Sequence, residues 1–172
     1  MNIIVTGGLG FIGSEFVKYA SNQGAHCTVI DNMTYAADKS RLNGYNYDLI
    51  LKDICEDVSF ACQDAHYIVN FAAESHVDRS IKDGKPFLKS NIEGTFNMLE
   101  IARQIPTLKK FIQISTDEVY GDIDGFWDGE ADSSTLLDPS SYYSATKASA
   151  VTPVTKGERN SLVGWITGPN FK

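Results

Sequence analysis

Tyr143 and Lys147 are the residues whose types and spacing point most directly to chemistry. Side chains four residues apart on a helix share one face. A lysine ammonium beside a tyrosine stabilises the tyrosinate and lowers the pKa of the phenol, so the pair predicts a base for an alcohol or sugar hydroxyl. A surface pair is the alternative, because this spacing also arises by chance.

A second polar group stands in the run Ser115-Thr116-Asp117-Glu118, after a β-prone segment. A hydroxyl and two carboxylates at the carboxyl end of a parallel strand point into the ligand crevice of an α/β sheet. Burial and mutual repulsion can separate the pKa values of neighbouring acids, as acid–base catalysis requires. The alternative interpretation is a polar turn with a solvated acid pair.

Glycines stand at positions 7, 10 and 13, between a β-branched run and a predicted helix. Such a turn lets backbone N–H groups approach a pyrophosphate, and the helix dipole favours the anion. Asp31 ends the next predicted strand, where an acid accepts the ribose hydroxyls of NAD and repels the extra phosphate of NADP. The pattern predicts NAD binding; an ordinary turn and a strand-end aspartate are the alternatives.

Strands that alternate with helices must position these residues. The predicted strands are 3–6, 26–31, 49–51, 67–73 and 110–116, and the predicted helices are 11–23, 56–63, 86–104 and 141–150, with a cap at Ser140 or Ser141. This alternation predicts an α/β fold with a Rossmann-like, doubly wound parallel sheet covered on both faces. A surface loop is expected over 121–139.

The composition is that of a globular protein, with 172 residues, 42% of them hydrophobic, and a net charge of −7. We expect one domain with its own core. The acidic charge disfavours nucleic-acid binding. The three cysteines form no metal or disulfide pattern, and the sequence shows no signal peptide or apolar membrane span, so we expect a cytoplasmic protein that does not contact membranes.

Residues 1–150 resemble the extended short-chain dehydrogenase/reductases, and among them the dTDP-glucose 4,6-dehydratases. The matching stretches are 6–14, 31–36, 52–54, 70–80, 91–95 and 115–121, together with Tyr143 and Lys147. Within them, the triplet Thr116-Asp117-Glu118 discriminates, because the related 4-epimerases lack the acid pair.

The resemblance implies NAD as cofactor, dTDP-glucose as substrate and a catalytic set. Tyr143 would take the proton of the sugar 4-hydroxyl, which Thr116 binds, while C4 gives its hydride to NAD. Glu118 would remove the C5 proton, Asp117 would protonate the leaving 6-hydroxyl, and the hydride would return to C6. Lys147 completes the set. The helices 86–104 and 141–150 would form the surface of a homodimer.

The resemblance also implies a cofactor groove, with adenine at Asp53 and Ile54. The residues expected to bind the cofactor are Gly7, Gly10, Phe11, Ile12, Gly13, Asp31, Asn32, Thr34, Asp53, Ile54, Phe71, Ala72, Ala73, Ser75, Asn91, Tyr143 and Lys147.

Members of this family are longer, and their second half completes the sheet and forms the sugar-nucleotide subdomain, which this chain is expected to lack. The residues from 151 to 172 resemble instead the carboxyl end of 2-oxoglutarate/iron(II) oxygenases, in which the counterpart of Arg159 pairs with the cosubstrate carboxylate. The metal-binding histidine would fall at Ser149 and is absent. His76-Val77-Asp78 has the form of an iron site but lies inside the dehydratase-like stretch, so no metal is predicted. Residues 161–167 are β-prone and predict at most one added strand.

Three functions stay open at this point. The chain is an active nucleotide-sugar 4,6-dehydratase, a non-catalytic NAD-binding module, or a fragment that pairs with a full-length relative. The catalytic residues favour the first function, and the missing substrate subdomain favours the other two. We favour a dehydratase-like NAD-binding domain with restricted activity.

Overall fold

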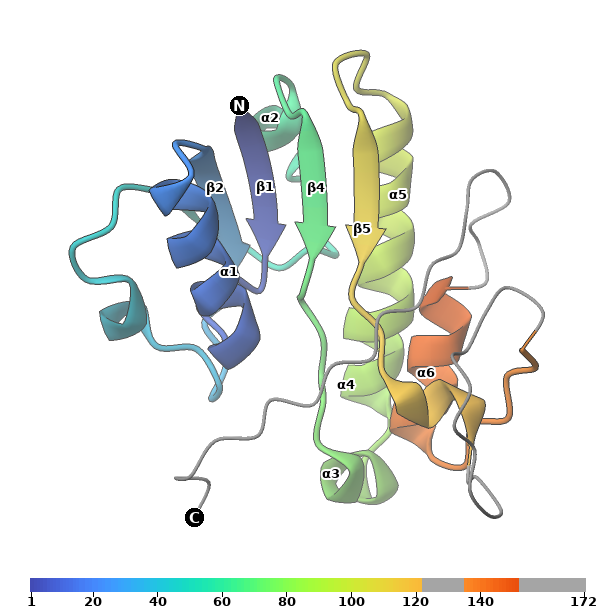
Figure 1. Ribbon diagram of the computed structural model, residues 1–172. Helices are drawn as coiled ribbons and strands as arrows, with labels where there is room; N and C mark the ends of the chain where they lie inside the picture. The colour runs from blue at the N-terminus through green and yellow to red at the C-terminus, as the bar shows by residue number, and fades with distance from the viewer. Residues whose placement is uncertain (122–134, 152–172) are drawn as a thin grey trace.

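Five strands form one parallel sheet in the computed structural model, which describes residues 1–121 and 135–151 (Figure 1). The strand order is β3-β2-β1-β4-β5, and the bounds are β1 Asn2–Thr6, β2 His26–Asp31, β3 Asp48–Leu51, β4 Tyr67–Asn70 and β5 Lys110–Gln113. Every neighbouring pair is parallel. The predicted Rossmann-like parallel sheet is therefore confirmed.

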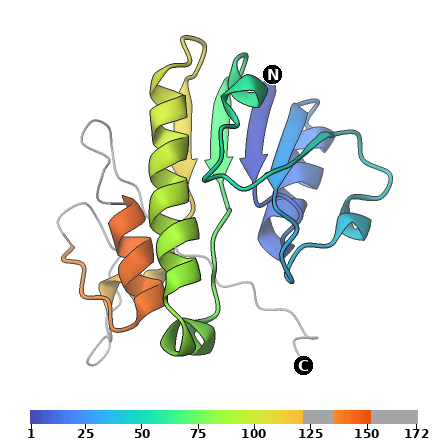
Figure 2. The same ribbon diagram turned by 180° about the vertical axis from the view of Figure 1, so that it is seen from behind.

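Helices cover both faces of the sheet. Helix α1 (Phe11–Asn22) lies on one face, and α2 (Ser59–Cys62) and α5 (Thr95–Arg103) lie on the other (Figures 1 and 2). The other elements are α3 Val77–Lys82, α4 Lys85–Phe87, α6 Tyr142–Val151, the 3-10 turns η1 Lys39–Leu42 and η3 Asp117–Tyr120, and the π-helical segment η2 Leu88–Gly94. Helix α6 packs against η2, α3 and η3 at the carboxyl edge of the sheet.

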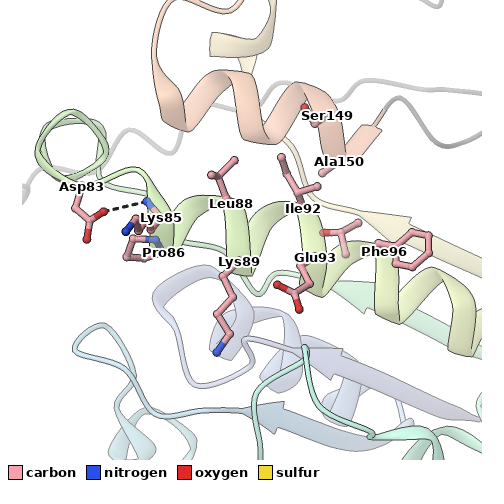
Figure 3. Close-up of a pocket in the computed structure, with 11 residues that line it drawn as sticks. Asp83, Lys85, Pro86, Leu88, Lys89, Ile92, Glu93, Phe96, Ser149 and Ala150 are labelled. Carbon is pink, nitrogen blue, oxygen red and sulfur yellow. Dashed lines mark hydrogen bonds between the residues drawn. The ribbon is translucent and has the colours of Figure 1, made fainter.

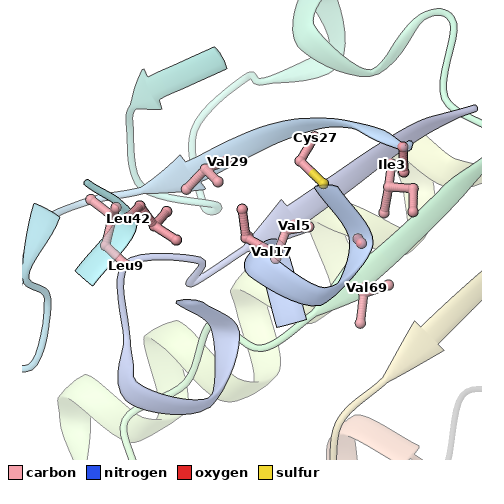
Figure 4. Packing of buried hydrophobic residues seen from close by; sticks show 10 residues of the cluster. Ile3, Val5, Leu9, Val17, Cys27, Val29, Leu42 and Val69 are labelled. Carbon is pink, nitrogen blue, oxygen red and sulfur yellow. The ribbon is translucent and has the colours of Figure 1, made fainter. Parts of the chain in front are cut away.

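The core has two layers because side chains alternate along β1. Ile3 and Val5 pack with Val17 of α1, and Figure 4 shows this layer together with Val29 of β2. Ile4 points the other way and packs in the layer that contains α2 and α5. Burial on both faces explains why the strand is an unbroken apolar run in the sequence.

Several elements differ from the sequence-based expectations. Strands β4 and β5 end at Asn70 and Gln113, because the residues that follow leave the sheet to line a groove. The predicted helix 86–104 is present as α4, η2 and α5, with a π-helical turn in the middle. The predicted helix 56–63 is reduced to α2, and α3 was not predicted.

Some expectations fall on residues 122–134 and 152–172, which lie outside the described part of the chain. They are most of the surface loop, Arg159, the added strand at 161–167, and all of the tail except its first residue. No helix within 1–121 and 135–151 is long and apolar enough to cross a membrane.

Candidate functional site

The glycine loop joins β1 to α1 at the carboxyl edge of the sheet. Gly7 has a φ of +65°, which glycine adopts without steric cost. A Cβ atom on Gly7 would lie 2.7 Å from the nitrogen of Ala72, and one on Gly13 would collide with the carbonyl oxygen of Gly7. These close backbone approaches leave a cradle at the amino terminus of α1, which fits a pyrophosphate.

Both backbone polar groups of Leu9, in the middle of this loop, are held by the last residue of β2 and by the segment that follows it. Its N–H donates to one carboxylate oxygen of Asp31 at 3.0 Å, and the other oxygen accepts the N–H of Met33 at 2.8 Å. The Leu9 carbonyl accepts the N–H of Asp38 at 2.9 Å and the guanidinium of Arg41 at 2.8 Å. The chain itself therefore fixes the shape of the glycine loop.

A buried polar network supports the loop after β4. The Thr6 hydroxyl accepts the N–H of Ala72 at 3.3 Å and hydrogen-bonds the side chain of Asn70. The amide of Asn70 also donates to Gln113 at 2.7 Å and to Thr95 at 3.3 Å. The ends of β1, β4 and β5 are thus tied to α5, which explains the one polar side chain of strand β4.

A groove with a volume of about 560 Å³ opens along this edge of the sheet, from the β3 side to α6. Its volume is typical of a cofactor site. Apart from Asn91, all the residues that the sequence predicts for the cofactor line this groove: Gly7, Gly10, Phe11, Ile12, Gly13, Asp31, Asn32, Thr34, Asp53, Ile54, Phe71, Ala72, Ala73, Ser75, Tyr143 and Lys147.

Asn91 lies behind the wall of the groove, buried in η2. Its Oδ1 accepts the N–H of Glu74 at 2.9 Å, and its Nδ2 donates to the carbonyl of Glu74 at 3.0 Å and to the hydroxyl of Thr146 at 2.9 Å. Asn91 therefore ties the loop after β4 to α6. It positions residues that face the groove and does not line the groove itself.

Asp53 and Ile54 form the end of the groove below β3. Burial opposes the ionisation of Asp53, but the N–H of Cys55 and the ammonium of Lys89, 3.2 Å away, outweigh it and hold the pKa of this carboxyl below its usual value. Ile54 fits against Gly94, where a Cβ atom would lie 2.6 Å from its Cδ1. This end offers an acceptor beside an apolar surface.

Helix α6 carries Lys147 at the other end of the groove. The hydroxyl of Ser141 accepts the N–H of Ser144 at 3.0 Å, so the expected cap is at Ser141. Lys147 is 4% exposed, and its Nζ donates to the carbonyl of Ile114 at 2.5 Å. Burial lowers the pKa of Lys147 to about 8.

Tyr143 lies one turn earlier on α6, with its ring edge-on to Phe87 at 6.4 Å between centroids. Burial raises its pKa, a hydrogen bond with Thr116 lowers it, and the charges of Glu118 and Asp117 raise it again, so that the pKa lies above its ordinary value. The predicted lowering of this pKa by Lys147 is therefore wrong for this structure. Burial is the largest influence on the pKa of Tyr143, and the ammonium of Lys147 donates its hydrogen bond to the carbonyl of Ile114 instead.

The acid pair begins η3, which starts four residues after the last residue of β5. Oδ1 of Asp117 accepts the hydroxyl of Thr116 and the N–H of Glu118, each at 3.1 Å. Burial raises the pKa of Glu118, and the negative charge of Asp117 raises it further. Thr116, Asp117 and Glu118 do not line the cofactor groove, but η3 packs against α6 beside Tyr143.

Sequence reasoning did not assign several groove residues to the cofactor. They are Ile30, Tyr35, Ala36, Ala37, Arg41, Lys52, Glu74, His76, Ser90, Ile114 and Ser115. Tyr35 and Glu74 lie inside matching stretches, so their motifs carried a signal. Arg41 lies in η1, which no pattern marks. Within the described residues no group of histidine, cysteine and acidic side chains is arranged to hold a metal.

Comparison with known proteins shows the family of this chain. Residues 4–163 match the family described as GDP-mannose 4,6 dehydratase. The chain belongs to this family. Within the GDP-mannose 4,6 dehydratase family and its nucleotide-sugar dehydratase and epimerase relatives, it corresponds to the NAD-binding region. The match continues past residue 151 into the part of the chain that the structure does not describe.

Curated relatives of this chain include a protein named for glycan biosynthesis and a probable nucleotide-sugar dehydratase. Low-salt glycan biosynthesis protein Agl12 of Haloferax volcanii is 45% identical over 157 residues. The probable dTDP-glucose 4,6-dehydratase of Sinorhizobium fredii is 40% identical over 166 residues. Each alignment covers 87% of this chain, which spans 49% and 47% of the two relatives, or about half of their length.

Solved structures show the same partial coverage. The dTDP-glucose 4,6-dehydratase DesIV of Streptomyces venezuelae, solved with NAD bound, superposes with a TM-score of 0.80 at 35% identity, over 87% of this chain and 49% of that one. A UDP-glucose 4-epimerase of Thermotoga maritima superposes with a TM-score of 0.77 at 30% identity, over 87% of this chain and 48% of that one. A nucleotide-sugar dehydratase and a nucleotide-sugar 4-epimerase therefore share the fold of this chain over about half of their length.

Proposed function

We propose that this chain binds NAD and carries the catalytic residues of a nucleotide-sugar 4,6-dehydratase that acts on dTDP-glucose. The observation that carries the proposal is the meeting of two predicted groups at one end of the groove. The segment η3, which begins with the acid pair, packs against α6, so that Thr116 lies close enough to Tyr143 to lower the pKa of its phenol. The glycine loop lies along the same groove as Tyr143.

The groove suits NAD because backbone and side chains supply complementary groups along its length. The glycine cradle takes the pyrophosphate, and Asp53 with Ile54 contacts adenine. Each carboxylate oxygen of Asp31 accepts one backbone N–H and keeps a lone pair for a ribose hydroxyl. A 2′-phosphate in this position would meet the negative charge of Asp31, so the groove selects NAD over NADP.

The residues at the α6 end divide the chemistry among them. NAD bound in the groove would supply the acceptor for the hydride of C4 and the donor of a hydride to C6. Tyr143 takes the proton of the 4-hydroxyl, and Thr116, which lies close to Tyr143, binds the same hydroxyl. The resulting 4-keto group makes the C5 proton acidic. Glu118 removes that proton, and its raised pKa makes it a stronger base. Asp117, in its protonated form, protonates the leaving 6-hydroxyl, so water is lost. Glu118 returns a proton to C5 as the hydride reaches C6.

The proposal is tested by calorimetric titration with NAD and NADP, followed by assay of the 4-keto-6-deoxy sugar through its absorbance in alkali. We expect the chain to bind NAD more tightly than NADP, and Asp31→Ala to weaken NAD by about 1–3 kcal/mol. Tyr143→Phe should abolish turnover while NAD binding persists. Tighter binding of NADP, or full turnover by Tyr143→Phe, would refute the assignment.

A second candidate function is an NAD-binding module with little or no turnover. Its support is that the chain spans about half the length of its relatives. Rate depends on holding the sugar at near-attack distance, and the binding energy for this comes from the remote nucleotide end of the substrate. NAD binding without formation of product would favour this second function. If product formation then appeared when a full-length relative was added, the third function would be favoured, in which the chain is a fragment that pairs with such a relative.

We also propose that two copies associate through α4, η2, α5 and α6. Leu88 and Ile92 of η2 and Phe96 of α5 form an apolar stripe along these two consecutive helical segments. Figure 3 shows them with Ser149 and Ala150 of α6 around a cavity of about 800 Å³. Leu88 is 54% and Phe96 61% exposed, which is a large apolar surface for one helix. A twofold axis across the stripe would make it self-complementary.

A further inference from the structure

Tyr35 connects the two walls of the cofactor groove. The guanidinium carbon of Arg79 lies 3.9 Å from the centroid of the Tyr35 ring, and the His76 ring lies 5.7 Å from the same centroid. The Tyr35 hydroxyl donates to the carboxylate of Glu74 at 3.4 Å. A single side chain from one wall is thus held by three side chains from the other wall.

The sheet order shows what this contact crosses. Tyr35 follows β2, whereas Glu74, His76 and Arg79 follow β4. Strand β1 lies between β2 and β4, and the glycine loop begins where β1 ends. The contact therefore bridges the gap beside the glycine loop, and Tyr35 and Glu74 both line the groove there.

We propose that Tyr35, Glu74 and Arg79 form a latch over the middle of the groove, which a dinucleotide must pass as it enters and leaves. A ligand that reaches from Asp53 to Lys147 runs along the groove that Tyr35 and Glu74 also line. It therefore passes the point where the walls are joined. This inference rests on the NAD binding proposed above.

The latch opens without unfolding, because the backbone on each side is anchored independently. Asn91 holds both the N–H and the carbonyl of Glu74. Arg41 holds the carbonyl of Ala36, the residue after Tyr35, at 2.9 Å. Tyr35 is 51% exposed, so its side chain turns away from Arg79 with little loss of packing. An exposed contact between a cation and a ring is weak enough to break and re-form rapidly.

A latch has a kinetic signature that a simple cofactor contact lacks. A barrier across the groove slows entry and departure alike. Its removal speeds association and dissociation by similar factors, about fivefold each for an exposed cation–ring contact, while Kd changes by less than about twofold. A residue that only touches the cofactor would instead raise the dissociation rate and Kd together and leave association unchanged.

The test is stopped-flow fluorescence of NADH binding to the whole chain. Tyr35→Ala and Arg79→Ala should each speed both rates, and the double variant should do no more than Tyr35→Ala, because that variant already removes the contact with Arg79 together with those to Glu74 and His76. Tyr35→Phe keeps the ring and should retain most of the barrier. Tyr19→Ala is the matched control, because Tyr19 is 65% exposed on α1 and does not line the groove.

The outcomes separate the latch from the proposed function. A wild-type chain that binds neither NAD nor NADH overturns both. Wild-type binding with unchanged association rates in Tyr35→Ala and Arg79→Ala overturns the latch alone, as does an equal change in Tyr19→Ala. Circular dichroism of each variant during urea unfolding shows whether it retains the wild-type fold.

Discussion

The buried ammonium of Lys147 lowers the free energy of unfolding at neutral pH. Burial lowers its pKa from 10.5 to about 8, so between these values the native chain binds fewer protons than the unfolded chain, and stability rises with pH. We expect the free energy of unfolding of the wild type, relative to Lys147→Met, to rise by about 2 kcal/mol between pH 7 and about pH 9.5. Urea unfolding at both pH values measures this difference.

The comparison with Lys147→Met cancels the titration of every other group. Lys110→Met is the matched control, because Lys110 is exposed at the start of β5 and its replacement should leave the pH dependence of the wild type in place. If the wild type and Lys147→Met changed in parallel with pH, the buried ammonium would not be the source of the cost.

The acid pair of Asp117 and Glu118 gives a second prediction about single residues. Because the charge of Asp117 is one of two causes that raise the pKa of Glu118, Asp117→Asn should lower that pKa toward its ordinary value, while burial keeps it somewhat above. A raised carboxyl pKa makes stability fall as pH rises, so the variant should lose less stability on that limb. Carboxyl carbon NMR of Glu118 follows the titration. Asp64→Asn, before β4, should leave it unchanged.

At the scale of elements, the glycine loop makes the sharpest prediction. Gly13→Ala should reduce NAD affinity at least tenfold, because the added Cβ would displace the carbonyl of Gly7 and widen the cradle. Gly44→Ala is the control. It carries a φ of +86° in open space, so it should cost about 1 kcal/mol of stability and leave NAD binding intact. Calorimetry and urea unfolding of both variants measure the two effects. Unimpaired NAD binding by Gly13→Ala would contradict the cradle.

Local patterns predicted most of the elements and the groove. The glycine spacing, the alternation of strands and helices and the acid at Asp31 act over a few residues, so they can be read from the chain. The π-helical turn of η2 could not, because its fit depends on Ile54 meeting Gly94 and on Asn91 reaching Glu74. These contacts join segments far apart in the sequence.

The electrostatics of the site were less predictable, since burial decides them. The spacing of Tyr143 and Lys147 is evident in the sequence, but the direction of the Tyr143 pKa depends on how deeply α6 is packed and on the carbonyl that takes the ammonium. The role of Arg41 could not be predicted from the sequence either, because it too depends on a contact between distant segments. Only the fold shows that η1 returns to the glycine loop.

At the scale of the whole molecule, the apolar stripe predicts assembly. Phe96→Glu should raise the dissociation constant of the proposed dimer about a hundredfold, because it buries a charge at the centre of the contact. Phe60→Glu is the matched control, because Phe60 of α2 is 53% exposed and does not line that cavity. Analytical ultracentrifugation over a range of concentrations should show dimers for the wild type and Phe60→Glu, and monomers for Phe96→Glu. A wild type that stays monomeric at high concentration would refute the assembly.

Among the five described strands, the central one is also the one that comes earliest in the sequence. Strand β1 pairs with β2 on one side and with β4 on the other, where Ile3 lies opposite Tyr67. During synthesis, the edge of β1 that pairs with β4 therefore stays without its partner strand until β4 emerges. At roughly 5–20 residues per second, this takes several seconds. An open edge of this kind pairs readily with another nascent chain. The pace of translation between β2 and β4 thus influences how much of the protein reaches the native sheet.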